Sequence, residues 1–196
     1  MARHVSKQIS LDFKSSFLSC EKDQETIWKK LFIENRPYSD YLKRLLVINE
    51  RDCLKKDNLE YQRIVDNTTL SFLMDNDYLR VVPKLAFGEH EQIKSYILLS
   101  FDDFVPTENP EFRDCVISFT IICHLDKWQL DDYKLRPHQI AGYIDGILNE
   151  SRLSGIGTLK FMGASEIIFN EYLGGIMLRY IATHGTDDVG DIDGEV

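Results

Sequence analysis

Apolar and polar residues alternate in two segments of the second half of the chain. The alternating apolar positions are Ile93, Ile97, Leu99 and Phe101, then Cys115, Ile117, Phe119, Ile121, Cys123 and Leu125. A period of two places every second side chain on the same face of a strand. The pattern predicts two long, half-buried strands in 93–101 and 114–126. Two further strands are predicted in 158–169 and 175–183.

The stretch after Arg136-Pro137 has the spacing of an amphipathic helix. Its apolar positions are Ile140, Tyr143, Ile144, Ile147 and Leu148. Side chains at i, i+3, i+4, i+7 and i+8 form one stripe, and a proline fits the first helical turn. A helix is therefore predicted here, ending before Gly155 and Gly157.

The first ninety residues read as helical and loop-rich. Helices are predicted in 21–35, which Pro37 ends or offsets, and from 38–40 onward, until the charged stretch 49–57. The apolar segments 70–73 and 79–82 fit either a helix end or a strand.

The resulting order, strand, strand, helix, strand, strand, predicts an α+β fold. A mainly antiparallel sheet of about four strands would be covered on one face by the single helix. We expect a helical and loop-rich region in 1–90, a sheet-and-helix core in 91–184 and an acidic tail in 185–196. The other sheet face would be covered by the N-terminal helices or by a neighbouring subunit.

The charge and composition of the chain argue against two classes of partner, nucleic acids and membranes. The formal net charge is -9, and five acidic residues without a basic one lie in 185–196. Sequence-specific nucleic-acid binding is not expected, because it requires clustered Lys and Arg. No apolar run is long enough to span a bilayer, so we expect no membrane partner. The four cysteines form no CxxC pair and are interpreted as reduced thiols in a cytosolic compartment.

Candidate catalytic chemistry is sparse. His124 and Asp126 lie two residues apart on one predicted strand face, and Asp102 and Asp103 close the preceding strand. Zinc needs three or four ligands at matched spacing, and neither pair provides them. We therefore expect no enzyme activity, no metal and no cofactor. The alternative is a small metal-dependent hydrolase or nuclease that uses these four residues together.

Two connectors offer candidate interface residues. Between the second strand and the helix lie Trp128, Tyr133, Lys134 and Arg136, and the loop 105–112 contains Val105, Pro106, Pro110 and Phe112. Aromatic residues and arginine anchor many protein interfaces. Packing of the first connector on its own domain is the alternative interpretation.

Four segments, 94–101, 115–126, 135–146 and 157–161, resemble in pattern and order the tail-terminator or tail-completion (neck) proteins of long-tailed bacteriophages. The resemblance implies a virion protein, assembled in the host cytoplasm, that forms a homo-oligomeric ring at the head–tail junction. Its partners would be other copies of itself, the tail tube, and neck or head-completion proteins. A terminator, an adaptor and a stopper position all remain open. The helical N-terminal region is longer than that fold requires.

Overall fold

The computed structural model describes residues 14–15, 20–81, 93–108, 112–185 and 187–188. Its helices are α2 (Cys20–Lys29), α3 (Tyr38–Val47), α4 (Leu59–Asn67), α5 (Leu70–Asp75) and α6 (Arg136–Leu148), with a π-helical stretch η1 (Lys30–Glu34) and a 3-10 turn η3 (Leu125–Lys127). Its strands are β1 (Lys14–Ser15), β2 (Leu79–Arg80), β3 (Ser95–Pro106), β4 (Phe112–His124), β5 (Arg152–Leu153), β6 (Gly157–Thr158), β7 (Lys160–Ile168), β8 (Leu173–Gly185) and β9 (Asp187–Asp188). None of these described helices is both long and apolar enough to cross a bilayer.

The main sheet has five strands in the order β2-β3-β4-β8-β7. The four long strands are antiparallel, as predicted, while β2 adds a short parallel strand beside β3. The predicted count of about four strands is therefore one too low, because two residues of β2 carry too little pattern to identify a strand. The segment 70–82, ambiguous in sequence, contains both a helix, α5, and this strand.

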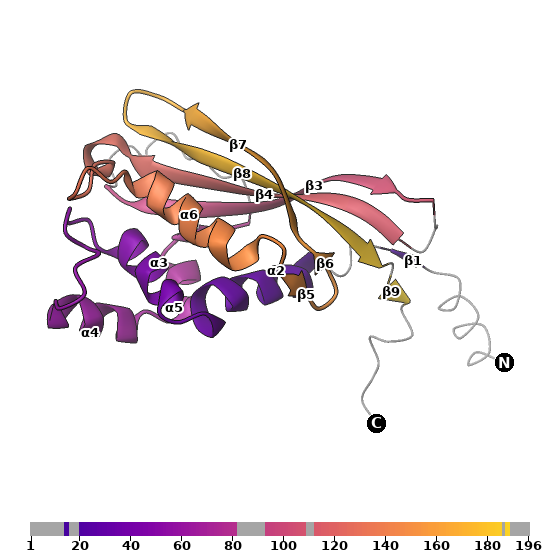
Figure 1. Cartoon of the computed structure of the whole chain (residues 1–196), viewed down its shortest axis with the longest axis horizontal. Helices are drawn as coiled ribbons and strands as arrows, with labels where there is room; N and C mark the ends of the chain where they lie inside the picture. Colours follow the sequence, from indigo (N-terminus) through magenta and orange to yellow (C-terminus); the bar gives the residue numbers. More distant parts are fainter. Residues whose placement is uncertain (1–13, 16–19, 82–92, 109–111, 186, 189–196) are drawn as a thin grey trace.

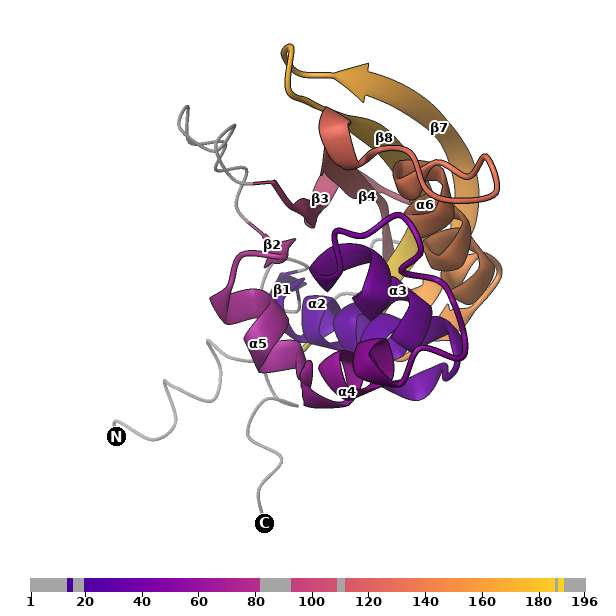
Figure 2. The same cartoon turned by 90° about the vertical axis from the view of Figure 1, so that its left-hand side faces the viewer.

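All the longer helices lie on one face of the sheet (Figures 1 and 2). The alternating residues of β4, from Cys115 to Cys123, join the helices in one buried core. Trp28 of α2 meets Phe119 edge-on, with ring centroids 6.3 Å apart. The N-terminal helices thus share the α6 side of the sheet instead of covering the opposite face.

The opposite face carries a small second cluster of buried residues, Tyr96, Ile122 and Leu173. The guanidinium of Arg80 lies 4.3 Å from the centre of the Tyr96 ring, a cation–π contact. Among the described residues, no helix packs on this face (Figure 2).

Two short helices begin at recognisable caps. The side chain of Asn58 accepts hydrogen bonds from the backbone N–H groups of Glu60 and Tyr61, and the Thr69 hydroxyl accepts one from Phe72. Such caps satisfy N–H groups that the first helical turn leaves unpaired. Helix α4 was not predicted, and Val65 is the buried residue that it contributes to the core.

The two central strands also extend further than their apolar pattern suggested. Strand β3 continues to Pro106 and β4 begins at Phe112, so both ends of the loop expected in 105–112 belong to strands. A bulge lies between Asp102 and Val105, with Asp103 at a φ of 50°. At the C-terminus, β9 pairs antiparallel with β1, so part of the predicted solvated tail belongs to a two-stranded sheet.

One glycine is required by the pairing of β4 with β8. A Cβ at Gly175 would lie 1.7 Å from the carbonyl oxygen of Ile121. The backbones therefore approach so closely that only a hydrogen atom fits at this position.

Candidate functional site

A tight hairpin between η3 and α6 displays the most exposed aromatic side chain described. We call residues 129–135 the Tyr133 turn. Its ends are bridged at Gln129 and Leu135, and Leu130 N donates to Lys134 O at 2.8 Å. Asp132 and Tyr133 adopt φ values of 58° and 59°, and Tyr133 is 97% exposed. Because left-handed backbone costs a non-glycine residue about 1–2 kcal/mol, the turn holds a tyrosine ring in solvent at a conformational cost.

Arg136 anchors the base of this turn from inside the protein. It is 0% exposed. Its Nη1 donates to Leu45 O at 2.6 Å and Ile48 O at 2.8 Å, its Nη2 to Glu50 O at 3.1 Å, and its Nε to Lys127 O at 2.9 Å. The guanidinium therefore fixes the turn against α3 and lies outside the surface that we expected it to share with Tyr133.

The remaining residues of this connector divide between core and surface. Trp128 is half-buried and packs over Gly174, where a Cβ would lie 2.7 Å from its ring. Lys134 is exposed, with its ammonium 3.7 Å from the Asp132 carboxylate. Of the two interpretations left open in the sequence, packing on the domain applies to Trp128 and Arg136, whereas Tyr133 and Lys134 face solvent.

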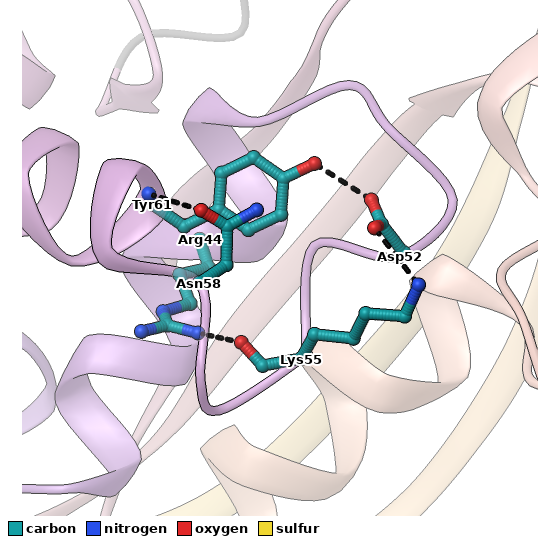
Figure 3. Close-up of polar contacts among 5 residues, drawn as sticks. All are labelled: Arg44, Asp52, Lys55, Asn58 and Tyr61. Atoms are coloured by element: carbon teal, nitrogen blue, oxygen red, sulfur yellow. Dashed lines mark hydrogen bonds and ion pairs between the residues drawn. The ribbon is translucent and has the colours of Figure 1, made fainter.

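Polar contacts hold the connector between α3 and α4 together (Figure 3), and this connector touches the Tyr133 turn. The Asp52 carboxylate accepts hydrogen bonds from Tyr61 Oη at 2.6 Å and Lys55 Nζ at 3.1 Å. The bond to Tyr61 lowers the pKa of Asp52 and raises the pKa of Tyr61 to about 12. Next to Asp52, Arg51 O accepts a hydrogen bond from Asp131 N of the Tyr133 turn at 3.1 Å.

Arg44 also holds this connector: its Nη1 donates to Lys55 O at 2.6 Å (Figure 3). Its Nη2 donates to Gln62 Oε1 at 2.8 Å. These supporting residues were not found by sequence reasoning. No fixed spacing marks them, because they converge only when α3, α4 and the turn are packed together.

The other predicted interface lies at the β3–β4 connection. Val105 is exposed on the bulged end of β3. Pro106 ends β3 opposite Arg113, and Phe112 begins β4 opposite Gly185. Pro110 and the side chains of Pro106 and Phe112 lie outside the described part of the chain.

A groove of about 420 Å³ runs along the exposed side of α6, which we call the α6 groove. Its lining residues are Tyr38, His138, Gln139, Gly142, Tyr143, Gly146 and Ile147. A Cβ at Gly142 or Gly146 would meet nothing within 4 Å, so no contact with the described residues requires these glycines. Each glycine lowers helix stability by about 0.8–1.0 kcal/mol relative to alanine.

The two walls of the α6 groove differ in chemistry. On one side Tyr143 stacks on Tyr41 with ring centroids 5.6 Å apart and lies 6.2 Å from the Tyr38 ring. On the other side His138 Nε2 lies 3.4 Å from Glu166 Oε1 of β7. Aromatic rings thus line one part of the groove and His138, which is paired with Glu166, lines another, around the bare helix surface at Gly142 and Gly146.

The four residues of the hydrolase alternative do not meet in one site. Asp102 pairs with Val116, and His124 lies eight positions further along β4. At about 3.3 Å per residue, roughly 26 Å separate the two groups. His124 instead caps η3, because its Nδ1 accepts a hydrogen bond from Asp126 N at 3.2 Å. In the described part of the chain, no three His, Cys, Asp or Glu side chains form a potential metal site.

The cysteines lie in surroundings that suppress thiolate formation. Burial raises the pKa of Cys115 to about 12 and that of Cys123 to about 11. Cys53 is also buried with a raised pKa, and Cys20 is half-buried. Because the thiolate is the nucleophile, these three buried groups behave as core side chains.

Comparison with known proteins gives a family and remote structural likenesses. The model of the YomW family matches residues 39–182. A chain from the virion of a native gene transfer agent (GTA) particle has a TM-score of 0.39 and 18% identity, covering 64% of this chain and 90% of that chain. These values are too low to transfer a function. No curated protein shows a significant match.

Proposed function

We propose that this chain, which belongs to the YomW family, is a non-catalytic structural subunit of a phage-type virion that assembles with copies of itself. The observation that carries the proposal is the Tyr133 turn, where a fully displayed aromatic ring is held on strained backbone. Rigid, exposed aromatic side chains are the residues that anchor protein interfaces when they enter a partner's pocket.

The free edge of the sheet supports the same proposal. Strand β7 pairs with β8 alone among the described strands. Its exposed apolar residues include Phe161, Met162 and Ile168. A long apolar edge of this kind is a template for contact with another chain.

Within the virion, we propose a position at the head–tail junction for this subunit. The segments that resemble tail-terminator proteins, 94–101, 115–126, 135–146 and 157–161, form much of β3, β4, α6 and the start of β7. We propose that the assembled ring caps the tail tube and joins it to the neck or head-completion proteins in the virion, after assembly in the host cytoplasm. Terminator, adaptor and stopper remain alternative positions for this ring.

The particle mass in solution tests self-assembly. Light scattering after size exclusion should give an integral multiple of 22.8 kDa, and negative-stain images should show closed rings. The Tyr133→Ala variant should assemble at least about tenfold more weakly, which corresponds to 1.4 kcal/mol or more at a central aromatic. The matched control is Leu59→Ala, which also removes an exposed side chain and should leave assembly unchanged.

A second assay addresses the junction itself. Purified protein added to polymerising tail-tube subunits should stop elongation and appear at one tube end. A strictly monomeric chain at every concentration, with no effect on tube length, would contradict the proposed role.

A further inference from the structure

Two features of the surface are unexplained by contacts within one chain. The Tyr133 turn holds consecutive left-handed residues and exposes its tyrosine. The α6 groove has a floor made by Gly142 and Gly146, which weaken the helix without admitting any neighbour from the same chain. The Tyr133 turn projects from the surface, whereas the α6 groove is a depression in it.

We infer that the α6 groove of one copy receives the Tyr133 turn of the next copy, an inference that rests on the proposed self-assembly. The groove volume of about 420 Å³ has room for a tyrosine ring and its flanking backbone. Its wall of Tyr38 and Tyr143 presents ring faces and edges to an entering aromatic. The floor without side chains lets the incoming backbone approach the helix closely.

The charges beside the two features are complementary. In the turn, Asp132 and Lys134 flank Tyr133, and both charged side chains are exposed. Near the groove, Arg36 lies two residues before Tyr38 in the sequence and pairs with Asp40, and Glu166 pairs with His138 of the groove lining. A docked turn can therefore place Asp132 near Arg36 and Lys134 near Glu166. This pairing favours the turn over an uncharged apolar segment as the occupant.

The geometry of this contact determines the type of assembly. The turn and the groove are different surfaces of one chain, so the contact is heterologous: it closes a ring when the rotation between copies closes, and it builds an open helical filament when it does not. Each copy then contributes one turn and receives one turn.

Filling the groove provides a variant that does not disturb the fold. Gly146→Leu places a side chain in open space on a helix and improves helix propensity, so its melting temperature should not fall. Gly146→Ala is the matched control, because it improves the helix while leaving most of the groove empty. Light scattering should show assembly weakened at least tenfold for Gly146→Leu and for Tyr133→Ala, and little changed for Gly146→Ala.

Mixing the two defective variants identifies the occupant. Tyr133→Ala retains a groove and Gly146→Leu retains a turn, so an equimolar mixture should form one-to-one dimers that neither variant forms alone. If wild-type protein assembles and Gly146→Leu assembles equally well, the groove is not the interface and the inference is overturned while the proposed function stands. If Gly146→Leu blocks assembly but the mixture stays monomeric, another segment occupies the groove and the inference is also overturned. A monomeric wild type would remove the proposed function itself.

Discussion

Replacing Arg136 by methionine should destabilise the protein by about 3–6 kcal/mol. The guanidinium is 0% exposed and donates to four backbone carbonyls. The carbonyls of Leu45 and Ile48 are reached by buried hydrogen bonds, whereas those of Lys127 and Glu50 are partly accessible. Water can replace the donor at the accessible pair, so the cost arises mainly from the two buried acceptors, at about 1.5–3 kcal/mol each.

Urea unfolding measures this cost directly. The midpoint should fall while the slope m stays constant, since the same surface is exposed on unfolding. Lys134→Met is the matched control, because it removes an exposed positive charge two residues away and should change stability by less than about 0.5 kcal/mol. Arg136→Lys should resemble the methionine variant, because an ammonium cannot reproduce the planar donor fork. A loss below about 1 kcal/mol for Arg136→Met would refute the view that this residue ties the turn to α3.

Four further substitutions test the packing and the turn. Gly142→Ala should raise stability by about 0.8–1 kcal/mol in thermal melts, because its Cβ enters open space; no change would argue against a regular, solvent-facing helix there. Gly175→Ala should cost about 3 kcal/mol or more, because its Cβ would lie 1.7 Å from Ile121 O, and a neutral result would show that the strands lie further apart. Tyr133→Gly should stabilise the chain by about 0.5–1 kcal/mol in urea, because glycine accepts a φ of 59° without strain, and a loss would indicate that the ring has partners within the chain. Cys115 has a folded pKa of about 12 against 9.0 for the free group, so the unfolded state releases its proton first and stability falls as pH rises from about 9 to 12; the Cys115→Val variant should lose less over this range, measured as urea midpoints.

The long strands and helix α6 could be predicted because each shows a regular pattern of hydrophobic residues in the sequence. Alternation placed Cys115, Ile117 and Phe119 on the buried face of β4, and the structure confirms their burial. Similarly, the stripe that includes Ile140 and Ile144 predicted α6, whose core positions are buried. Both patterns arise from burial of one face, which local sequence records directly.

The features that the sequence did not predict depend on contacts between segments that are distant in the sequence. Arg136 was read as a surface residue, because a lone arginine carries no local sign that carbonyls from α3 will surround it. The side of the sheet chosen by the N-terminal helices was also undetermined, since an amphipathic pattern shows that a helix face is buried without showing which layer buries it. The α6 groove was missed for a related reason: Gly142 and Gly146 become significant only when Tyr38 of α3 lies beside them.

The close approach at Gly175 fixes the alignment of two strands that no tight turn connects. If β8 slid by two positions along β4, Leu173 or Met177 would bring a Cβ into the space beside Ile121 O that admits only hydrogen. A slide by one position would exchange the buried and outer side chains. The register of β4 with β8 is therefore set by the two strands themselves. The segment that connects them, which includes α6, does not need to fix this register.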